Sequence, residues 1–284
     1  MDGAAGDSSA DETASLFADP PDFYAPTVPA RTTTYTRASG EVLTLHLPPQ
    51  HSLWAHHLWN GGRVLARMID TPGGIPVESP QVTLNPSRRP PPPPPPHAAA
   101  VCPPGAPLSL CLDGLSVAEL GAGAGLPSLL AASTARAVVA TDYPDPPLLA
   151  ALAVNAAAVA ATAPIAVAGL RWGDAPTAAA LVDEHGPFDV VLMADLVSNH
   201  SAHSKLLTTL EILVGGPSGG GVGVVAYGHH RVACVDADEE FFAVAADAGW
   251  HVGGGAAVQC APMFADDPGD AEVRGAVHVS ILYR

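Results

Sequence analysis

The stretch of sequence that decides the fold lies at residues 117–125 and reads VAELGAGAG. It joins a short apolar strand to a glycine-rich turn, and a second apolar strand, residues 137–141, is followed directly by Asp142. Glycines let a backbone approach a ligand closely, and a carboxylate at the end of the neighbouring strand can bind two ribose hydroxyls. The helix after the turn opens with Leu126 and Pro127. We therefore expect a nucleoside cofactor without phosphates, of which S-adenosylmethionine is the usual one.

The glycine-rich loop also has a plainer explanation, because the chain contains 28 glycines and such a loop can arise by chance. A glycine motif alone is a weak signal. Here a strand precedes the loop, a helix follows it and an acid ends the next strand. Together these features favour a ligand site over a coincidence of composition.

The composition argues against some classes of partner. The net charge is −16 with only 12 lysines and arginines in 284 residues, which argues against nucleic acid because phosphate binding needs clustered cations. The charge is compatible with a basic protein partner or a cationic substrate. No uninterrupted apolar stretch of about 18 residues predicts a membrane span, and the acidic start of the chain lacks the features of a leader peptide. We therefore expect a cytoplasmic protein.

Two low-complexity segments bound the folded part of the chain. Residues 1–29 carry six acids and no base, which predicts a disordered acidic tail. Residues 30–284 are expected to form a single domain, interrupted by a proline-rich insertion at 85–107 that contains seven consecutive prolines. Such a run adopts polyproline II. It could dock on an SH3 or WW domain, but an exposed insertion without a partner is the favoured interpretation.

The remaining sequence alternates apolar strands with helices, which predicts an α/β fold with a parallel sheet covered on both faces. A β-hairpin (residues 32–35 and 42–47) and a helix (residues 53–69) are expected before it. The expected strands are 117–120, 137–141, 165–169, 190–194 and 222–227, with two late strands near 250–258 and 276–282. The expected helices are 127–134, 147–160, 175–184, 203–214 and 236–248. The last helix is expected to start with a capping box of Asp236 and Glu239 and to stop at Gly249.

Polar residues follow the strands at the edge where ligands bind in such sheets. Glu119 and the glycines end the first strand of the sheet, Asp142 ends the second and Trp172 follows the third, while Asp195, Asn199 and His200 follow the fourth. Two more histidines, His229 and His230, follow the fifth. A metal site is not expected, because neither the histidines nor the four cysteines have a metal-binding pattern.

Several segments of the chain resemble a known family. They are residues 16–26, 51–60, 119–127, 141–145 and 194–201, and the DYPD and NHS sequences within them are far more specific than the glycine loop. The chain resembles the fungal protein N-terminal and lysine methyltransferases that act on translation elongation factor 1-alpha, once labelled nicotinamide N-methyltransferases. That family belongs to the seven-stranded class I (Rossmann-like) methyltransferases. The resemblance implies a seven-stranded sheet with helices on both faces, an N-terminal hairpin and helix extension, and S-adenosylmethionine as cofactor.

The resemblance also implies a set of cofactor-binding residues. They are Trp59 beside the cofactor, Gly121, Ala122 and Gly123 along its amino-acid portion, Asp142 on the ribose, Trp172 beside the adenine, and Ala194. For the two tryptophans, ordinary core packing is the alternative. The chain departs from related lysine methyltransferases at Ser198, where they carry the tyrosine of an Asp-x-x-Tyr motif, so no role of that ring can be assigned.

Methyl transfer to an amine requires the nitrogen to be uncharged and aligned with the methyl group. We expect Asp195 and Asn199 to hold the incoming amine, while His200 or a water takes its proton. Two other functions stay open. One is N-methylation of a small molecule such as nicotinamide, which needs a closed pocket instead of an open groove. The other is a non-catalytic binding module that docks through its proline tract.

Overall fold

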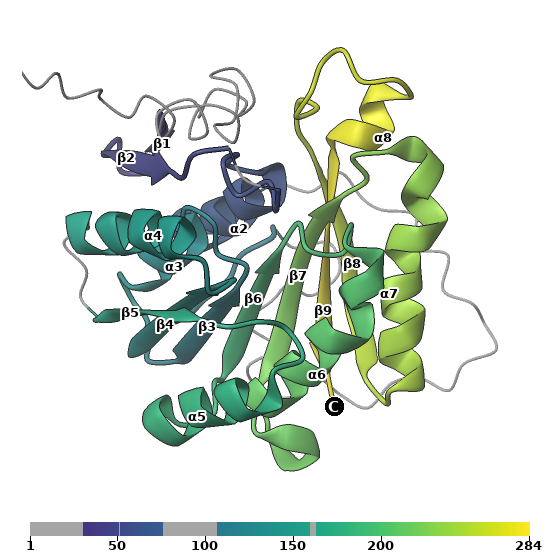
Figure 1. The fold of residues 1–284 in the computed structure, drawn as a ribbon. Coiled ribbons are helices and arrows are strands. Elements are labelled where there is room, and N and C mark those ends of the chain that lie inside the picture. Colours follow the sequence, from purple (N-terminus) through teal and green to yellow (C-terminus); the bar gives the residue numbers. More distant parts are fainter. Residues whose placement is uncertain (1–30, 51, 76–106, 160–162) are drawn as a thin grey trace, which may run out of the picture.

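The computed structural model describes residues 31–50, 52–75, 107–159 and 163–284, and Figure 1 shows how their elements are arranged. A seven-stranded sheet has the strand order β5-β4-β3-β6-β7-β9-β8, and β1 and β2 form a separate hairpin. The expected α/β fold is therefore confirmed. The acidic tail expected at 1–29 lies outside the described residues, as does the expected proline-rich insertion up to residue 106.

The strands and helices follow the sequence pattern closely. The strands are β1 (Arg31–Thr36), β2 (Val42–Leu47), β3 (Ser116–Leu120), β4 (Ala137–Asp142), β5 (Ile165–Gly169), β6 (Val190–Ala194), β7 (Val222–Gly228), β8 (His251–Gln259) and β9 (Ala276–Tyr283). The α-helices are α2 (Asn60–Asp70), α3 (Leu126–Ala131), α4 (Pro146–Ala158), α5 (Ala175–His185), α6 (His203–Leu213), α7 (Val235–Asp247) and α8 (Ala271–Gly275). Within the described ranges, no helix is long and apolar enough to cross a membrane.

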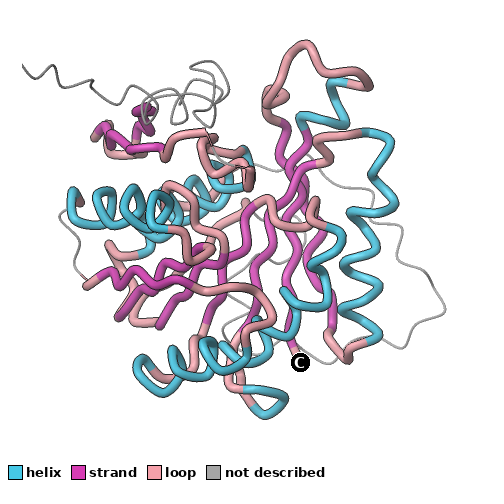
Figure 2. Tube along the Cα trace, in the orientation of Figure 1, coloured by secondary structure: helices cyan, strands magenta, loops and turns pink. Residues whose placement is uncertain are grey.

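Helices cover both faces of the sheet (Figure 2). Val64 and Leu65 of α2 pack with Val190 and Leu192 of β6 on one face, which α3 and α4 also cover. The intervening β6 residues, Val191 and Met193, pack on the other face against α5, α6 and α7. Because side chains alternate along a strand, a strand buried on both faces must be apolar throughout. This requirement explains the continuous apolar runs of the central strands.

The sheet is not the fully parallel sheet that the sequence predicted, because the strands at one edge are antiparallel. Strands β5, β4, β3, β6 and β7 are parallel, whereas β9 is antiparallel to both β7 and β8 and lies between them. The chain connects β8 to β9 through residues 260–275, which contain only the short α8 and no helix that packs across the sheet. A direct connection of this kind joins antiparallel neighbours, while parallel neighbours need a crossover.

The helix expected at 53–69 is wrong at its start, because residues 52–59 form turns and α2 begins at Asn60. The first turn of α2 lies against the end of β6. A Cβ atom on Gly61 would lie 2.5 Å from the Asp195 carboxylate and 2.8 Å from the Ala226 carbonyl oxygen. This close packing fixes where the helix starts, and it leaves the apolar residues before it to line a cavity instead of extending the helix.

The expected capping box of α7 is also wrong. The helix is capped at Cys234 without a side-chain hydrogen bond, and Glu239 instead accepts a hydrogen bond from the Tyr227 hydroxyl at 2.8 Å. The stop at Gly249 is confirmed. This glycine has φ +87°, and its N–H donates to the Ala246 carbonyl, as a glycine does after a helix end.

The hairpin β1-β2 is fixed to the rest of the fold by apolar packing and by one buried amide. Leu45 and Leu47 point inward and pack with Leu126 and Leu129 of α3. The Asn155 side chain of α4, 1% exposed, accepts from the His46 N–H at 2.7 Å. Its NH2 group donates to the His46 and Ala124 carbonyl oxygens, both at 2.9 Å. Asn155 therefore connects the hairpin, α4 and the glycine-rich loop.

We predict that Asn155→Ala lowers the free energy of unfolding by about 1–3 kcal/mol, because it removes the partners of buried backbone groups. Urea denaturation followed by circular dichroism measures the change. Gln50→Ala removes an exposed amide and serves as the control, with an expected effect within about 0.5 kcal/mol. Equal losses in the two variants would contradict the connecting role of Asn155.

Candidate functional site

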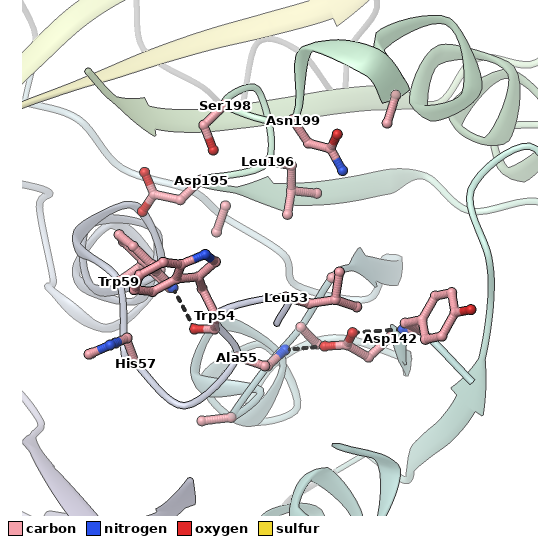
Figure 3. A pocket seen from close by; sticks show the side chains of 18 of the residues that line it. Leu53, Trp54, Ala55, His57, Trp59, Asp142, Asp195, Leu196, Ser198 and Asn199 are labelled. Atoms are coloured by element: carbon pink, nitrogen blue, oxygen red, sulfur yellow. Dashed lines mark hydrogen bonds between the residues drawn. The ribbon is translucent and has the colours of Figure 1, made fainter. Parts of the chain in front are cut away.

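A cavity of about 720 Å³ opens at the carboxyl ends of β3, β4 and β6. It gathers nine of the ten residues expected at the site: Trp59, Gly121, Ala122, Gly123, Asp142, Trp172, Ala194, Asp195 and Asn199. The tenth, His200, is not among the lining residues. Figure 3 shows that Asp142 lies at one end of this cavity and Asp195 at the other, with Leu53 between them. The cavity therefore has a glycine-loop end and an Asp195 end.

The glycine-rich loop at the first end needs its glycines for two reasons. Gly121 and Gly123 have φ values of +60° and +55°, in the left-handed region where other residues are strained. A Cβ on Gly121 would lie 2.7 Å from a methyl carbon of Leu196, whereas a Cβ on Gly123 would meet nothing nearer than the Ala55 oxygen at 4.0 Å. The backbone at Gly123 is therefore left open toward the cavity.

Asp142, the last residue of β4, fixes this end of the cavity. One carboxylate oxygen accepts from the Gly123 N–H at 2.7 Å and the other from the Tyr143 N–H at 2.6 Å. Tyr143 in turn lies against Arg171, whose guanidinium donates to the tyrosine hydroxyl at 3.0 Å. Asp142 is only 7% exposed, but it borders the cavity. These contacts hold an acid at the position where a ribose can be bound.

The residues at this end fit a sulfonium nucleoside. The loop places backbone, not side chains, against the cavity, and the loop sequence brings no cation for a phosphate. The cavity volume lies within the range of about 300–1,000 Å³ that small-molecule sites occupy. Trp172 packs beside Gly121, where a Cβ would lie 3.2 Å from its ring. An aromatic ring and a carboxylate thus border the same space.

Asp195 connects three elements at the other end of the cavity. Its backbone has φ +56°, and its carboxylate, 2% exposed, accepts from the Gly61 N–H at 2.5 Å and from the Gly228 N–H at 3.0 Å. The Nε2 atom of His230 lies 3.2 Å from the same carboxylate. The start of α2 and the ends of β6 and β7 therefore meet at one buried negative charge.

His200 and Asn199 diverge, although they are adjacent in sequence. Asn199 lines the cavity, and its amide oxygen accepts from the Ser201 hydroxyl at 3.1 Å. The His200 ring instead lies 2.7 Å from the Asp238 carboxylate, whose other oxygen is 2.9 Å from His229. Burial alone would raise the pKa of Asp238, but the hydrogen bonds from His229 and His200 outweigh it and lower that pKa.

His229 is the second partner of this buried carboxylate. Burial disfavours its charged form, yet the Asp238 and Glu239 carboxylates overcome that effect and raise the pKa of His229 to about 9. His229 and Asp238 therefore form a buried ion pair, and His200 is hydrogen-bonded to the same carboxylate. Among the described residues, no group of three or more His, Cys, Asp or Glu side chains could hold a metal ion.

The sequence did not identify several residues of the cavity wall. Residues 52–55 and His57 line the cavity because they form turns, although the sequence pattern predicted a helix there. Phe264 and Asp267 come from the connection between β8 and β9. Lys205 and Arg171 add positive charge. The exposure of Leu53 and Trp54, 48% and 55%, is set by tertiary packing and could not be read from the sequence.

Comparison with known proteins gives matches over most of the chain. Residues 105–247 match a family model described as lysine methyltransferase. The chain is 34% identical over 274 residues to the protein N-terminal and lysine N-methyltransferase efm7 of Schizosaccharomyces pombe, covering 93% of this chain and 92% of that protein. It is 32% identical to the protein of the same name from Neurospora crassa, covering 94% and 86%. Among solved structures, it is similar to a SAM-dependent methyltransferase from Anabaena variabilis, at 14% identity and a TM-score of 0.44 over 60% of this chain and 77% of that one.

Glu119, just before the glycine loop, is a buried acid in the cavity wall. One of its oxygens accepts from the Ser128 N–H at 3.0 Å and from the Ser128 hydroxyl at 2.5 Å. Burial raises the pKa of Glu119 to about 8; the Ser128 hydrogen bonds oppose this rise, and the nearby charge of Asp142 adds to it. In the folded protein this side chain is therefore mostly protonated, and so uncharged, at neutral pH.

We predict a distinct pH dependence of stability from Glu119. Its pKa is higher in the folded state than in the unfolded state, so the folded protein binds more protons between pH 4.5 and about 8. Its contribution to stability therefore falls as the pH rises through this window. Glu119→Gln lacks this ionisation and so does not lose stability in this way. The free energy of unfolding of the variant minus that of wild type should therefore rise between pH 5 and pH 8, by up to about 4 kcal/mol.

Urea denaturation of both proteins at the two pH values measures this difference. Glu240→Gln replaces an exposed carboxylate by the same amide and controls for the change in net charge. A difference between Glu119→Gln and wild type that is constant across the window would show that Glu119 ionises in the same way in both states.

Proposed function

The chain belongs to the family of protein N-terminal and lysine N-methyltransferases, and we propose that it methylates the N-terminal α-amine and an adjacent lysine of translation elongation factor 1-alpha. The chain is a protein methyltransferase, and S-adenosylmethionine is its cofactor. The choice of elongation factor 1-alpha rests on the sequence resemblance. The proposal that both the α-amine and a lysine are methylated rests on the names of the relatives.

The observation that carries the proposal is the single cavity with an acid at each end (Figure 3). The glycine-loop end fits a nucleoside, which leaves the Asp195 end for the acceptor amine. The rim between them is exposed to solvent at Leu53 and Trp54, which are 48% and 55% exposed. An extended polypeptide end can enter such a cavity, whereas a small substrate such as nicotinamide would favour a closed one.

S-adenosylmethionine supplies an electrophilic methyl group when bound. We assign Gly121, Ala122 and Gly123 to its amino-acid portion and Asp142 to its ribose, because the open backbone of the loop and the carboxylate border the same space. Trp172 would lie beside the adenine. Trp59 and Ala194, which both line the cavity, would complete the site near Asp195.

The residues at the other end would align the amine and accept its proton. Asp195 is already bonded to two backbone N–H groups, so its main effect on a substrate is a fixed negative charge and a fixed position for His230. Asn199 has an amide in the cavity that can bond the amine. His200 is hydrogen-bonded to Asp238 and does not line the cavity. We therefore propose that His230 or a water, and not His200, accepts the proton of the amine.

The acidity of the substrate amine sets the preference for a chain end. An α-amine has a reference pKa of about 8 and lysine about 10.4, so the terminal amine is uncharged more often at neutral pH. Only the uncharged nitrogen has the lone pair that attacks the methyl group. The N-terminal amine should therefore react first, and a neighbouring lysine can follow only if the site favours loss of its proton.

We predict that the purified protein transfers labelled methyl groups to the N-terminal peptide of elongation factor 1-alpha. Peptide mass spectrometry locates the label. A substrate acetylated at its N-terminus should lose the α-amine signal, and a lysine-to-arginine substitution should remove only the lysine signal. Label found on nicotinamide and not on the protein would support the small-molecule alternative. Absence of cofactor binding in calorimetry would support the binding module.

We predict that Asp142→Ala weakens binding of S-adenosylmethionine by about 10- to 100-fold, because hydrogen bonds to a charged group contribute about 1.5–3 kcal/mol. Isothermal titration calorimetry measures the affinity. Asp113→Ala removes an exposed carboxylate that does not line the cavity and should leave the affinity unchanged. Thermal melting of both variants checks the fold, since Asp142 also bonds to Gly123 and Tyr143. Unchanged affinity in a folded Asp142→Ala protein would remove Asp142 from the ribose.

A further inference from the structure

Five rings form a continuous group at the Asp195 end of the cavity, and we call them the aromatic cluster. Its members are Trp54, His57, Trp59, His230 and Phe264. The ring centroids are 4.6 Å apart for Trp59 and His230, 5.9 Å for Trp59 and Phe264, and 5.3 Å for His57 and Phe264. All five side chains line the cavity, and none of them is fully buried. They are therefore not part of the apolar core.

The backbone presents these rings at some conformational cost. Trp54 has φ +60°, a left-handed conformation that is rare for a bulky residue, although its side chain is 55% exposed. Its carbonyl oxygen accepts from the Trp59 indole N–H at 3.1 Å and from the His57 N–H at 3.2 Å. Strain of this kind persists where surrounding contacts enforce it, often at binding sites. Here the enforcing contacts come from the cluster itself.

The electrostatics of the cluster favour a cation. The face of an aromatic ring attracts positive charge, and rings gathered around a site recognise methylated ammonium groups in general. Asp195 lies behind the cluster, 3.2 Å from His230. Burial, together with the charge of His56 and then of Arg31, lowers the pKa of His57, so that ring stays uncharged at neutral pH. The cluster therefore combines ring faces with a fixed carboxylate.

We propose that the aromatic cluster is a binding subsite for the methylated ammonium group of the substrate chain end, and that it retains partly methylated chains between rounds of transfer. This inference rests on the proposed function. In each round a carbon–nitrogen bond forms, the sulfur–carbon bond of the sulfonium breaks, and a neutral thioether leaves. The product ammonium must then lose a proton, to His230 or to a water, before the next round.

A subsite built from rings suits this sequence of products better than one built from hydrogen bonds. Each methyl group replaces an N–H donor, so hydrogen bonding to Asn199 or to water weakens from round to round. Attraction to ring faces needs only the charge, which the ammonium retains after every transfer. A quaternary nitrogen has no proton to lose, and the reaction ends there.

A pair of peptides tests the subsite directly. Both carry the first residues of elongation factor 1-alpha. One is capped by a trimethylammonium-acetyl group and the other by the neutral 3,3-dimethylbutanoyl group, which has the same shape. Calorimetry in the presence of S-adenosylhomocysteine measures both affinities. We expect the charged peptide to bind about 5- to 30-fold tighter to the wild-type protein.

Phe264→Leu should reduce that preference at least about three-fold, while Phe264→Tyr keeps the ring and the preference. Trp54→Leu provides a second test if Phe264→Leu does not fold. In turnover with excess cofactor, mass spectrometry should detect earlier release of mono- and dimethylated chains from Phe264→Leu than from Phe264→Tyr.

Equal affinities for the two peptides in the wild-type protein would overturn the subsite, and so would a preference that Phe264→Leu leaves unchanged. Failure of the proposed function is a separate result. If the protein transfers no methyl group to a chain end, yet prefers the charged cap in a way that depends on Phe264, the subsite is supported and the proposed substrate is rejected. If chain ends are methylated without any preference for the charged cap, the proposed substrate is supported and the subsite is rejected.

Discussion

The hydrogen bonds of the Asp195 carboxylate are the interaction on which the site depends. Its two oxygens accept from the N–H groups of Gly61 and Gly228, so the start of α2 and the ends of β6 and β7 meet at one buried charge. Removing a partner from a buried charge is costly. The tight approach of Gly61 leaves no room for a side chain. The aromatic cluster is positioned by the same contact, because Trp59 immediately precedes α2.

A second fixed point, Asp142, determines the other end of the cavity. Its carboxylate bonds to the glycine loop through Gly123, and Asn155 bonds to the same loop through the Ala124 carbonyl oxygen. The loop is thus held from the sheet and from α4, and through Asn155 it is also linked to the hairpin. A cofactor site needs this rigidity, because small displacements of positioned groups weaken both binding and alignment.

The sequence predicted most of the sheet and most of the site, and for a clear reason. Strand ends of an α/β sheet meet at one edge, so residues such as Asp142 and Asp195 could be grouped without knowing any distance. Contacts set only by tertiary packing could not be predicted. His200 is drawn to Asp238 from another element, and Phe264 reaches the cavity from a connection without periodic pattern. The turns before α2 were mistaken for helix because their apolar residues line a cavity and not a helix face.

The insertion of β9 between β7 and β8 has a consequence for synthesis of the chain. Ribosomes release β8 before β9, yet β8 joins the sheet only through β9. Until β9 emerges, the edge of β7 that pairs with β9 and the whole of β8 lack strand partners, and nascent chains with unpaired strand edges are prone to association. Chaperone demand during translation should therefore be greatest over this late interval, after the cofactor half of the sheet has already been made.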